Sequence, residues 1–336
     1  MRFLELGITR SSDYRITSVN SLGMVAGVRG SLADTSAPQG VYWKDDTLRE
    51  VAERLTRALG QLDHGSAEIR QINERGDILC LLFSKAGLEG SALLRAGEEA
   101  VVLGHARATL WAEDLNNHGQ VVGAILEEGR DPVAFVWQDH VLRRLGPGIG
   151  KLVNDKGQVV IEDYATDTYS LWTDGQRTPI DLSVFPPDGS LHLSALNNRG
   201  QIAGTFQRRR PFASIPFFWD GSTLVQLEYT GEALDLNDRG QVVGTLVTSK
   251  PGADPARFPL LWRAGVVTRL CGQQGEAQAI SENGLIAGVV EEEGGRRPVI
   301  WSDRALETDP LSAKLLPSAQ RAQRERQQEL TEVVKR

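Results

Sequence analysis

An internal repeat constrains this chain more than any other feature of its sequence. Seven segments carry a tight turn followed by a short apolar run; the turn has the form Asn-x-x-Gly in six of them and Ser-x-x-Gly in the seventh, and the glycines lie 38 to 53 residues apart. In such a turn the Asn side chain accepts hydrogen bonds from the backbone beyond it, and Gly takes a positive φ. The seven turn glycines are Gly23, Gly76, Gly119, Gly157, Gly200, Gly240 and Gly284.

A second landmark follows each turn glycine after about 15 to 22 residues, where an aromatic-rich segment ends in a hairpin such as Trp-Asp-Gly. A short alternating segment typical of a strand comes next. Each repeat therefore predicts four antiparallel strands, A to D. The aromatic position is Leu94 in the second copy and tryptophan in the other six: Trp43, Trp137, Trp172, Trp219, Trp262 and Trp301.

The length of the repeat predicts how the copies assemble. A four-stranded unit of about 43 residues cannot bury both faces of its sheet alone, so copies must stack on one another. Radial stacking gives a β-propeller, whereas a β-solenoid has about half this period per coil. We expect an all-β fold, a seven-bladed propeller over residues 1–311, with these residues typical of the repeat: Asn116, Gly119, Trp137, Asn197, Gly200, Trp219, Asn237, Gly240 and Trp262.

The two ends of the chain depart from the repeat. Residues 2–7 resemble a fourth strand, and we expect them to close the ring by pairing with blade 7, which removes two exposed sheet edges. Residues 312–336 lose glycine and become rich in Gln, Arg, Glu and Ala, so they predict a charged tail that is helical or disordered.

The repeat resembles a bacterial family named for its His-Ala-Phe segment. The shared pattern is best seen in DLNNHGQVVG followed by PVAFVWQDHVLRRLG, although Val133 stands where the family has its histidine. The resemblance implies a propeller-like repeat protein, and it leaves an extracellular location open. It implies little about activity, because one fold serves many functions.

The connections between strands predict where a partner binds. The A–B and C–D turns are short and uniform, and we call the side that carries them the hairpin face. The B–C and D–A connections vary widely in length, and they emerge on the opposite side, the loop face. Irregular loops on a rigid scaffold commonly carry function. The candidate residues on the loop face are Arg107, Trp111, Arg208, Arg209, Arg210, Arg296 and Arg297.

Several other classes of site find little support. The net charge of −7 and the lack of a long apolar run argue against nucleic-acid and membrane partners. The segment 146–151, GPGIGK, lacks the spacing of a phosphate-binding loop. A metal site from His64, His105 and His192 is conceivable across blades, but their spacing does not favour it, so we expect neither metal nor cofactor.

Cys80 and Cys271 are the only two cysteines and no secretory signal is legible, which indicates a cytoplasmic protein. No catalytic motif occurs, so we expect a non-catalytic scaffold that binds a protein or a small ligand through the loop face. An enzyme, a hydrolase or lyase with its site at the mouth of the central channel, is the first alternative. A carbohydrate-binding or surface-polymer-binding protein is the second.

Overall fold

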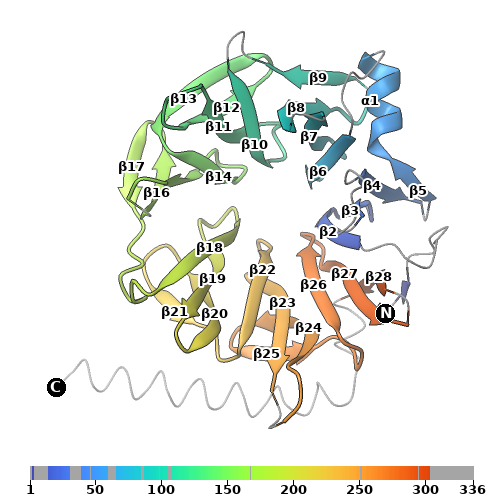
Figure 1. Cartoon of the computed structure of the whole chain (residues 1–336), viewed down its shortest axis with the longest axis vertical. Helices are drawn as coiled ribbons and strands as arrows, with labels where there is room; N and C mark the ends of the chain where they lie inside the picture. The colour runs from blue at the N-terminus through green and yellow to red at the C-terminus, as the bar shows by residue number, and fades with distance from the viewer. Residues whose placement is uncertain are drawn as a thin grey trace.

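A computed structural model describes residues 2–3, 14–30, 39–45, 47–59, 66–84, 87–97, 99–104, 108–166, 168–249, 252–293 and 295–302. Within these ranges, seven four-stranded sheets surround a central axis (Figure 1). All strand pairs that hold these sheets together are antiparallel. The fold is a seven-bladed β-propeller, which confirms the predicted fold class.

In six blades the strands follow the chain from the axis outward. Blade 1 is β2 (Tyr14–Val19), β3 (Val25–Arg29), β4 (Gln39–Lys44) and β5 (Thr47–Glu50). Blade 2 is β6 (Ser66–Ile72), β7 (Ile78–Ser84), β8 (Gly87–Leu94) and β9 (Ala100–Leu103). Blade 3 is β10 (Thr109–Leu115), β11 (Val121–Leu126), β12 (Val133–Gln138) and β13 (Val141–Pro147).

Blade 4 is β14 (Ile149–Val153), β15 (Val159–Asp163), β16 (Thr168–Thr173) and β17 (Gln176–Pro179). Blade 5 is β18 (Gly189–Leu196), β19 (Ile202–Arg209), β20 (Phe212–Trp219) and β21 (Leu224–Gln226). Blade 6 is β22 (Gly231–Leu236), β23 (Gln241–Thr248), β24 (Ala256–Arg263) and β25 (Val266–Arg269).

Blade 7 is assembled from both ends of the described chain. Its inner strands are β26 (Gly275–Ile280), β27 (Leu285–Glu292) and β28 (Gly295–Ser302). The outermost strand is β1 (Arg2–Phe3), in which Arg2 lies opposite Ile300 in antiparallel pairing. Residues 4–7 of the strand expected over 2–7, and the whole tail 312–336, lie outside the described residues.

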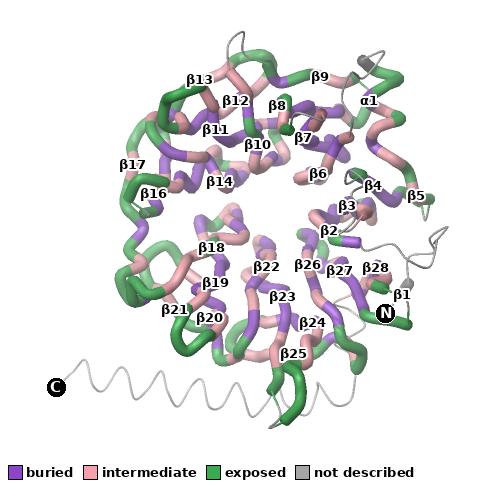
Figure 2. Tube along the Cα trace, in the orientation of Figure 1, coloured by how far each residue is buried: buried purple, intermediate pink, exposed green. Residues whose placement is uncertain are grey.

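The aromatic position of the repeat fills the interface between each blade and the one before it. Trp137 of blade 3 packs with Leu79 and Leu93 of blade 2, and Trp172 packs in the same way on blade 3. At the ring closure, Trp43 of blade 1 packs against Val289 of blade 7. Buried residues consequently run through the inner and middle strands of the blades, whereas exposed residues follow the loops (Figure 2).

The turn asparagine bonds both within its own blade and to the next. Asn116 accepts hydrogen bonds from the backbone N–H groups of His118 and Gln120, as the sequence predicts for a tight turn. Its amide group donates to Gln120 Oε1 at 2.7 Å and to the carbonyl oxygen of Asn154, in blade 4, at 2.9 Å.

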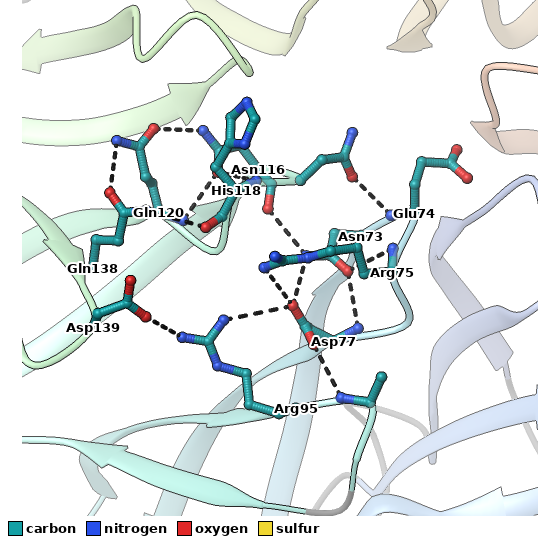
Figure 3. Close-up of polar contacts among 12 residues, drawn as sticks. Asn73, Glu74, Arg75, Asp77, Arg95, Asn116, His118, Gln120, Gln138 and Asp139 are labelled. Carbon is teal, nitrogen blue, oxygen red and sulfur yellow. Dashed lines mark hydrogen bonds and ion pairs between the residues drawn. The ribbon is translucent and has the colours of Figure 1, made fainter.

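The same inter-blade bond recurs from blade to blade, and the sequence did not predict it. Six asparagines make it: Asn20, Asn73, Asn116, Asn154, Asn197 and Asn237. Figure 3 shows the inter-blade bond from Asn73 to Asn116 and the turn bonds that Asn116 makes with His118 and Gln120. It also shows Asp77, which takes the place of Gln120 in blade 2. In blade 7 the position is Ser281, whose hydroxyl accepts from the backbone N–H of Leu285 at 3.0 Å.

Two connections on the loop face differ from the irregular loops expected there. Residues 51–59 form α1 (Val51–Leu59), which packs beside β4 and β6 with Val51 and Leu55 buried in the core. The segment 207–216 is the end of a long hairpin in which β19 and β20 pair up to Arg209 and Phe212. The composition of both segments is typical of loops. Burial of Val51 and Leu55 stabilises the helix in the first, and strand pairing continues through the second.

Candidate functional site

Every blade presents a β-bulge at the same place on its innermost strand. In blade 3 the pairing of β10 with β11 shifts between Ala112 and Asp114, so Glu113 is the extra residue. A bulge adds one residue to one strand and redirects its side chain. The extra residues of the seven innermost strands, all of which line the central channel, are Thr17, Arg70, Glu113, Lys151, Ser194, Leu234 and Gln278.

Three of these bulge residues form an ion-paired group across consecutive blades. Glu113 lies between Arg70 of blade 2 and Lys151 of blade 4, and it pairs with both. The Lys151 Nζ to Glu113 Oε1 distance is 2.8 Å. The Glu113 carboxylate is almost fully buried, whereas both cations retain exposure to the channel. Lys151 also lies 3.8 Å from Glu162, so every charge on this side of the channel wall has an opposite charge beside it.

A ring of side-chain-to-backbone bonds surrounds the channel mouth on the hairpin face. At the second position of six of the seven A–B turns, the side chain accepts a hydrogen bond from the backbone N–H of the matching residue in the preceding blade. Asp155 accepts from Asn117 in this way at 2.8 Å, and Asn198 accepts from Asp155 at 2.7 Å. The six acceptors are Glu74, Asn117, Asp155, Asn198, Asp238 and Glu282, and the bonds between Asn283 and Ser21 close the ring.

Three carboxyl groups near this mouth bind protons more tightly than usual. Burial raises the pKa of Asp114 to about 6 and that of Asp235 to about 7, although each accepts two backbone N–H hydrogen bonds. Burial also raises the pKa of Glu282 to about 7, and the neighbouring carboxylates Asp238, Glu74 and Asp155 add to the shift. Removing water from a carboxylate disfavours its charged form, which explains the common direction.

The channel widens into a cavity of about 390 Å³ between the bulge residues and the turn ring. Its wall contains seven carboxylates and two cations, so a neutral or cationic polar molecule would be tolerated there more readily than an anion. Within the described ranges, no group of three or more His, Cys, Asp or Glu side chains is placed to hold a metal ion. His192 lies in β18, whereas His64 and His105 fall outside those ranges.

The arginine cluster expected on the loop face lies at the tip of blade 5. Arg208 and Arg209 end β19, and Arg210 occupies the turn before Phe212, so a loop assignment for Arg208 and Arg209 was wrong. The reason is that pairing with β20 continues to the end of the hairpin. Arg209 and Arg210 are exposed, and Arg208 Nε donates to the carbonyl oxygen of Pro211 at 3.2 Å.

The other predicted loop-face residues are dispersed. Arg296 and Arg297 were expected in a loop but lie in β28 of blade 7, because this strand pairs with β27 from Gly295 onward. Their side chains pair with Glu276 and Glu292 respectively. Trp111 was expected in an irregular loop, but it lies in the innermost strand β10, because cross-strand pairing begins at Thr109. Its side chain is 39% exposed two residues before the bulge residue Glu113. Arg107 lies outside the described residues.

Apolar side chains on the loop face were missed at the sequence level. Tyr164 in the B–C turn of blade 4 is 76% exposed, Val184 in the connection to blade 5 is 59% exposed, and Phe212 is 78% exposed. Exposure depends on neighbours that a single segment does not reveal. The bulge residues had a usable signal, since each lies three positions before the first residue of the turn and varies within an otherwise regular repeat.

Comparison with known proteins identifies the fold alone. No protein-family model and no curated protein matches the chain. Among solved structures, the β-propeller domain of the Trilobed protease from Pyrococcus furiosus superimposes with a TM-score of 0.59 at 10% identity, covering 87% of this chain and 96% of that one.

Two larger proteins contain a part whose structure is similar to this chain, again at low sequence identity. A puromycin-hydrolysing peptidase from Mycobacterium tuberculosis matches with a TM-score of 0.57 at 10% identity, over 90% of this chain and 54% of its own. Prolyl oligopeptidase B from Galerina marginata matches with a TM-score of 0.50 at 12% identity, over 84% and 47% respectively. This chain therefore spans about half the length of those two enzymes.

Among the described residues, no helix is both long and apolar enough to cross a bilayer.

Proposed function

We propose that this protein is a non-catalytic β-propeller scaffold that binds a protein partner or a small ligand through its loop face. The observation that carries this proposal is that three strongly exposed apolar side chains, Tyr164, Val184 and Phe212, lie in loop-face segments of the neighbouring blades 4 and 5, the last of them on the same hairpin as the exposed Arg209 and Arg210. Isolated exposed apolar residues are common on protein surfaces, whereas a concentration of them marks interaction sites. Aromatic and arginine side chains are also the residue types enriched at binding hot spots.

The architecture supports the same assignment. Buried apolar clusters join neighbouring blades, and asparagine amides tie six of the blades to the next, so the face is carried by a stiff ring. A rigid scaffold keeps binding loops in one conformation, so they lose less conformational entropy when a partner binds. The resemblance to the His-Ala-Phe repeat family and the cytoplasmic location remain predictions.

Site-specific photo-crosslinking in the native host tests which face is used. The variant Tyr164→p-benzoylphenylalanine places the reactive group on the loop face, and Leu22→p-benzoylphenylalanine is the matched control on the hairpin face, where Leu22 is similarly exposed. We expect a covalent adduct from position 164 and none from position 22. An adduct from position 22 alone contradicts the choice of face, and turnover of a metabolite by the purified protein without a partner favours an enzyme.

A further inference from the structure

Resting on this proposed function, we propose that one sector of the loop face binds an acidic peptide segment that carries an apolar side chain. The sector consists of Tyr164, Val184, Arg209, Arg210 and Phe212, and we call it the blade 4–5 sector. Its occupant is a segment of a protein partner, with an aromatic or branched aliphatic residue flanked by Asp or Glu.

The sector rests on a firm base. Phe185 stacks on Phe206 with ring centroids 4.8 Å apart and contacts Phe217 at 5.2 Å, so the connection between the two blades is anchored in the core of blade 5. Its neighbour Val184 is left exposed. The backbone N–H of Arg209 donates to the carbonyl oxygen of Asp188 at 3.1 Å, which joins this connection to the β19–β20 hairpin.

The apolar side chains of the sector have no evident role in folding. Phe212 is the first residue of β20 and lies opposite Arg209 at the open tip of the hairpin, beyond the cluster formed by Phe185, Phe206 and Phe217. Its 78% exposure is the largest among the apolar side chains of the described residues. Removing a phenylalanine side chain from water on association is strongly favourable, so Phe212 is suited to be the anchor of the interface.

Charge selects the class of partner. Arg208, Arg209 and Arg210 form a run of three cations at the hairpin tip on a chain whose net charge is −7. Two exposed carboxylates, Asp181 and Asp188, lie in the connection between blades 4 and 5, and the pKa of Asp181 is held low by hydrogen bonds from Ser183. The tip therefore carries a local run of positive charge that a short acidic segment would meet, while the net negative charge of the chain repels extended anionic surfaces.

The overall charge also argues against a membrane as the occupant. An anionic bilayer presents negative charge over a wide area, and adsorption needs several cations or a large apolar face. One hairpin tip on a chain with a charge of −7 does not satisfy either condition. A peptide segment matches the size of the sector better.

The test uses the full chain and a phage-displayed library of random 12-residue peptides as the probe. We expect enriched peptides to combine Asp or Glu with an aromatic or aliphatic residue, and a fluorescent peptide of the enriched sequence to bind in the micromolar range. Arg209→Glu together with Arg210→Glu, and separately Phe212→Ala, should each weaken binding about tenfold or more. Arg209→Lys together with Arg210→Lys should retain most of it, because the contact depends on charge.

Matched controls lie on the hairpin face. Arg199→Glu together with Arg239→Glu makes the same change in charge at two exposed turn positions of blades 5 and 6, and Leu22→Ala removes an equally exposed apolar side chain. We expect neither to change the affinity. All variants alter exposed side chains, so their melting temperatures should stay close to that of the unmodified protein.

Three results would overturn the inference. The first is that no peptide is enriched, or that enriched peptides lack acidic residues. The second is that binding survives the Arg209, Arg210 and Phe212 variants. The third is that the protein sediments with vesicles of three parts phosphatidylcholine to one part phosphatidylserine in a Phe212-dependent manner. A photo-adduct from position 164 whose yield is unchanged by these variants would leave the proposed loop-face function standing and refute the acidic-peptide assignment alone.

Discussion

Removing the amide of Asn116 should measure how much the inter-blade bonds stabilise the propeller. The buried Asn116 side chain makes four hydrogen bonds, two of them to backbone N–H groups of its own turn. The other two go from its amide to Gln120 Oε1 and to the carbonyl oxygen of Asn154 in the next blade. In Asn116→Ala all four partners lose their bonds at once.

The expected loss follows from which partners water can reach. His118 is exposed, so water replaces the bond to its N–H, and the carbonyl oxygen of Asn154 still accepts from the N–H of Gly157 at 3.0 Å. The N–H of the half-buried Gln120 is harder to solvate. A buried polar group left without a partner costs about 1–3 kcal/mol, and the lost inter-blade bond adds a smaller amount, so we expect Asn116→Ala to lower the free energy of unfolding by about 2–3 kcal/mol. Urea titration followed by tryptophan fluorescence measures this change.

A serine variant separates the turn from the inter-blade contact. Blade 7 uses Ser281 at this position, and its hydroxyl accepts from the N–H of Leu285. Asn116→Ser should therefore keep one turn bond, lose the bond to Asn154, and cost about 1–2 kcal/mol. The exposed neighbour His118 provides the control, since His118→Ala should change stability by less than about 0.5 kcal/mol. A loss below about 1 kcal/mol for the alanine variant, or equal losses for alanine and serine, would refute this account of the bonds.

Three further predictions concern other positions. Because burial raises the pKa of Asp235 to about 7, the folded protein binds this proton more tightly than the unfolded chain, so stability should rise as pH falls from about 8 towards 4. Channel water reduces the effect, and we expect about 1–2 kcal/mol in urea titrations, with a flatter pH dependence in Asp235→Asn; an unchanged dependence would contradict it. A Cβ on Gly123 would lie 1.9 Å from the carbonyl oxygen of Trp111, so Gly123→Ala should cost about 2–3 kcal/mol, whereas Gly97→Ala, with open space around it, should be nearly neutral by thermal melting. Burial raises the pKa of the Cys80 thiol to about 12, so a thiol reagent at pH 8 should label Cys271 in the native protein, and Cys80 only after unfolding.

Local chemistry made much of this fold predictable. The repeated Asn-x-x-Gly turn sets its own conformation, as Gly119 at φ 77° and the two bonds to Asn116 Oδ1 illustrate. The C–D hairpins are also determined by local sequence: Asp174 and Gly175, at the tip of one of them, both adopt the positive φ values that a two-residue hairpin turn requires. Spacing alone then predicts the number of blades, because each copy needs two neighbours to bury its sheet faces.

The features that define the candidate site depend on contacts between segments far apart in the chain. Glu113 becomes a bulge residue only because β10 pairs with β11 in a particular register, and it meets Arg70 and Lys151 only because the ring places blades 2, 3 and 4 side by side. The same holds for Trp111 and Arg209, which resembled loop residues until cross-strand pairing placed them in strands. Turn preference acts over a few residues, so the sequence by itself determined the seven turns and the blade count. Strand limits, bulges, desolvated carboxylates and the exposure of Phe212 are set by the surroundings in space, so only the tertiary structure decided them.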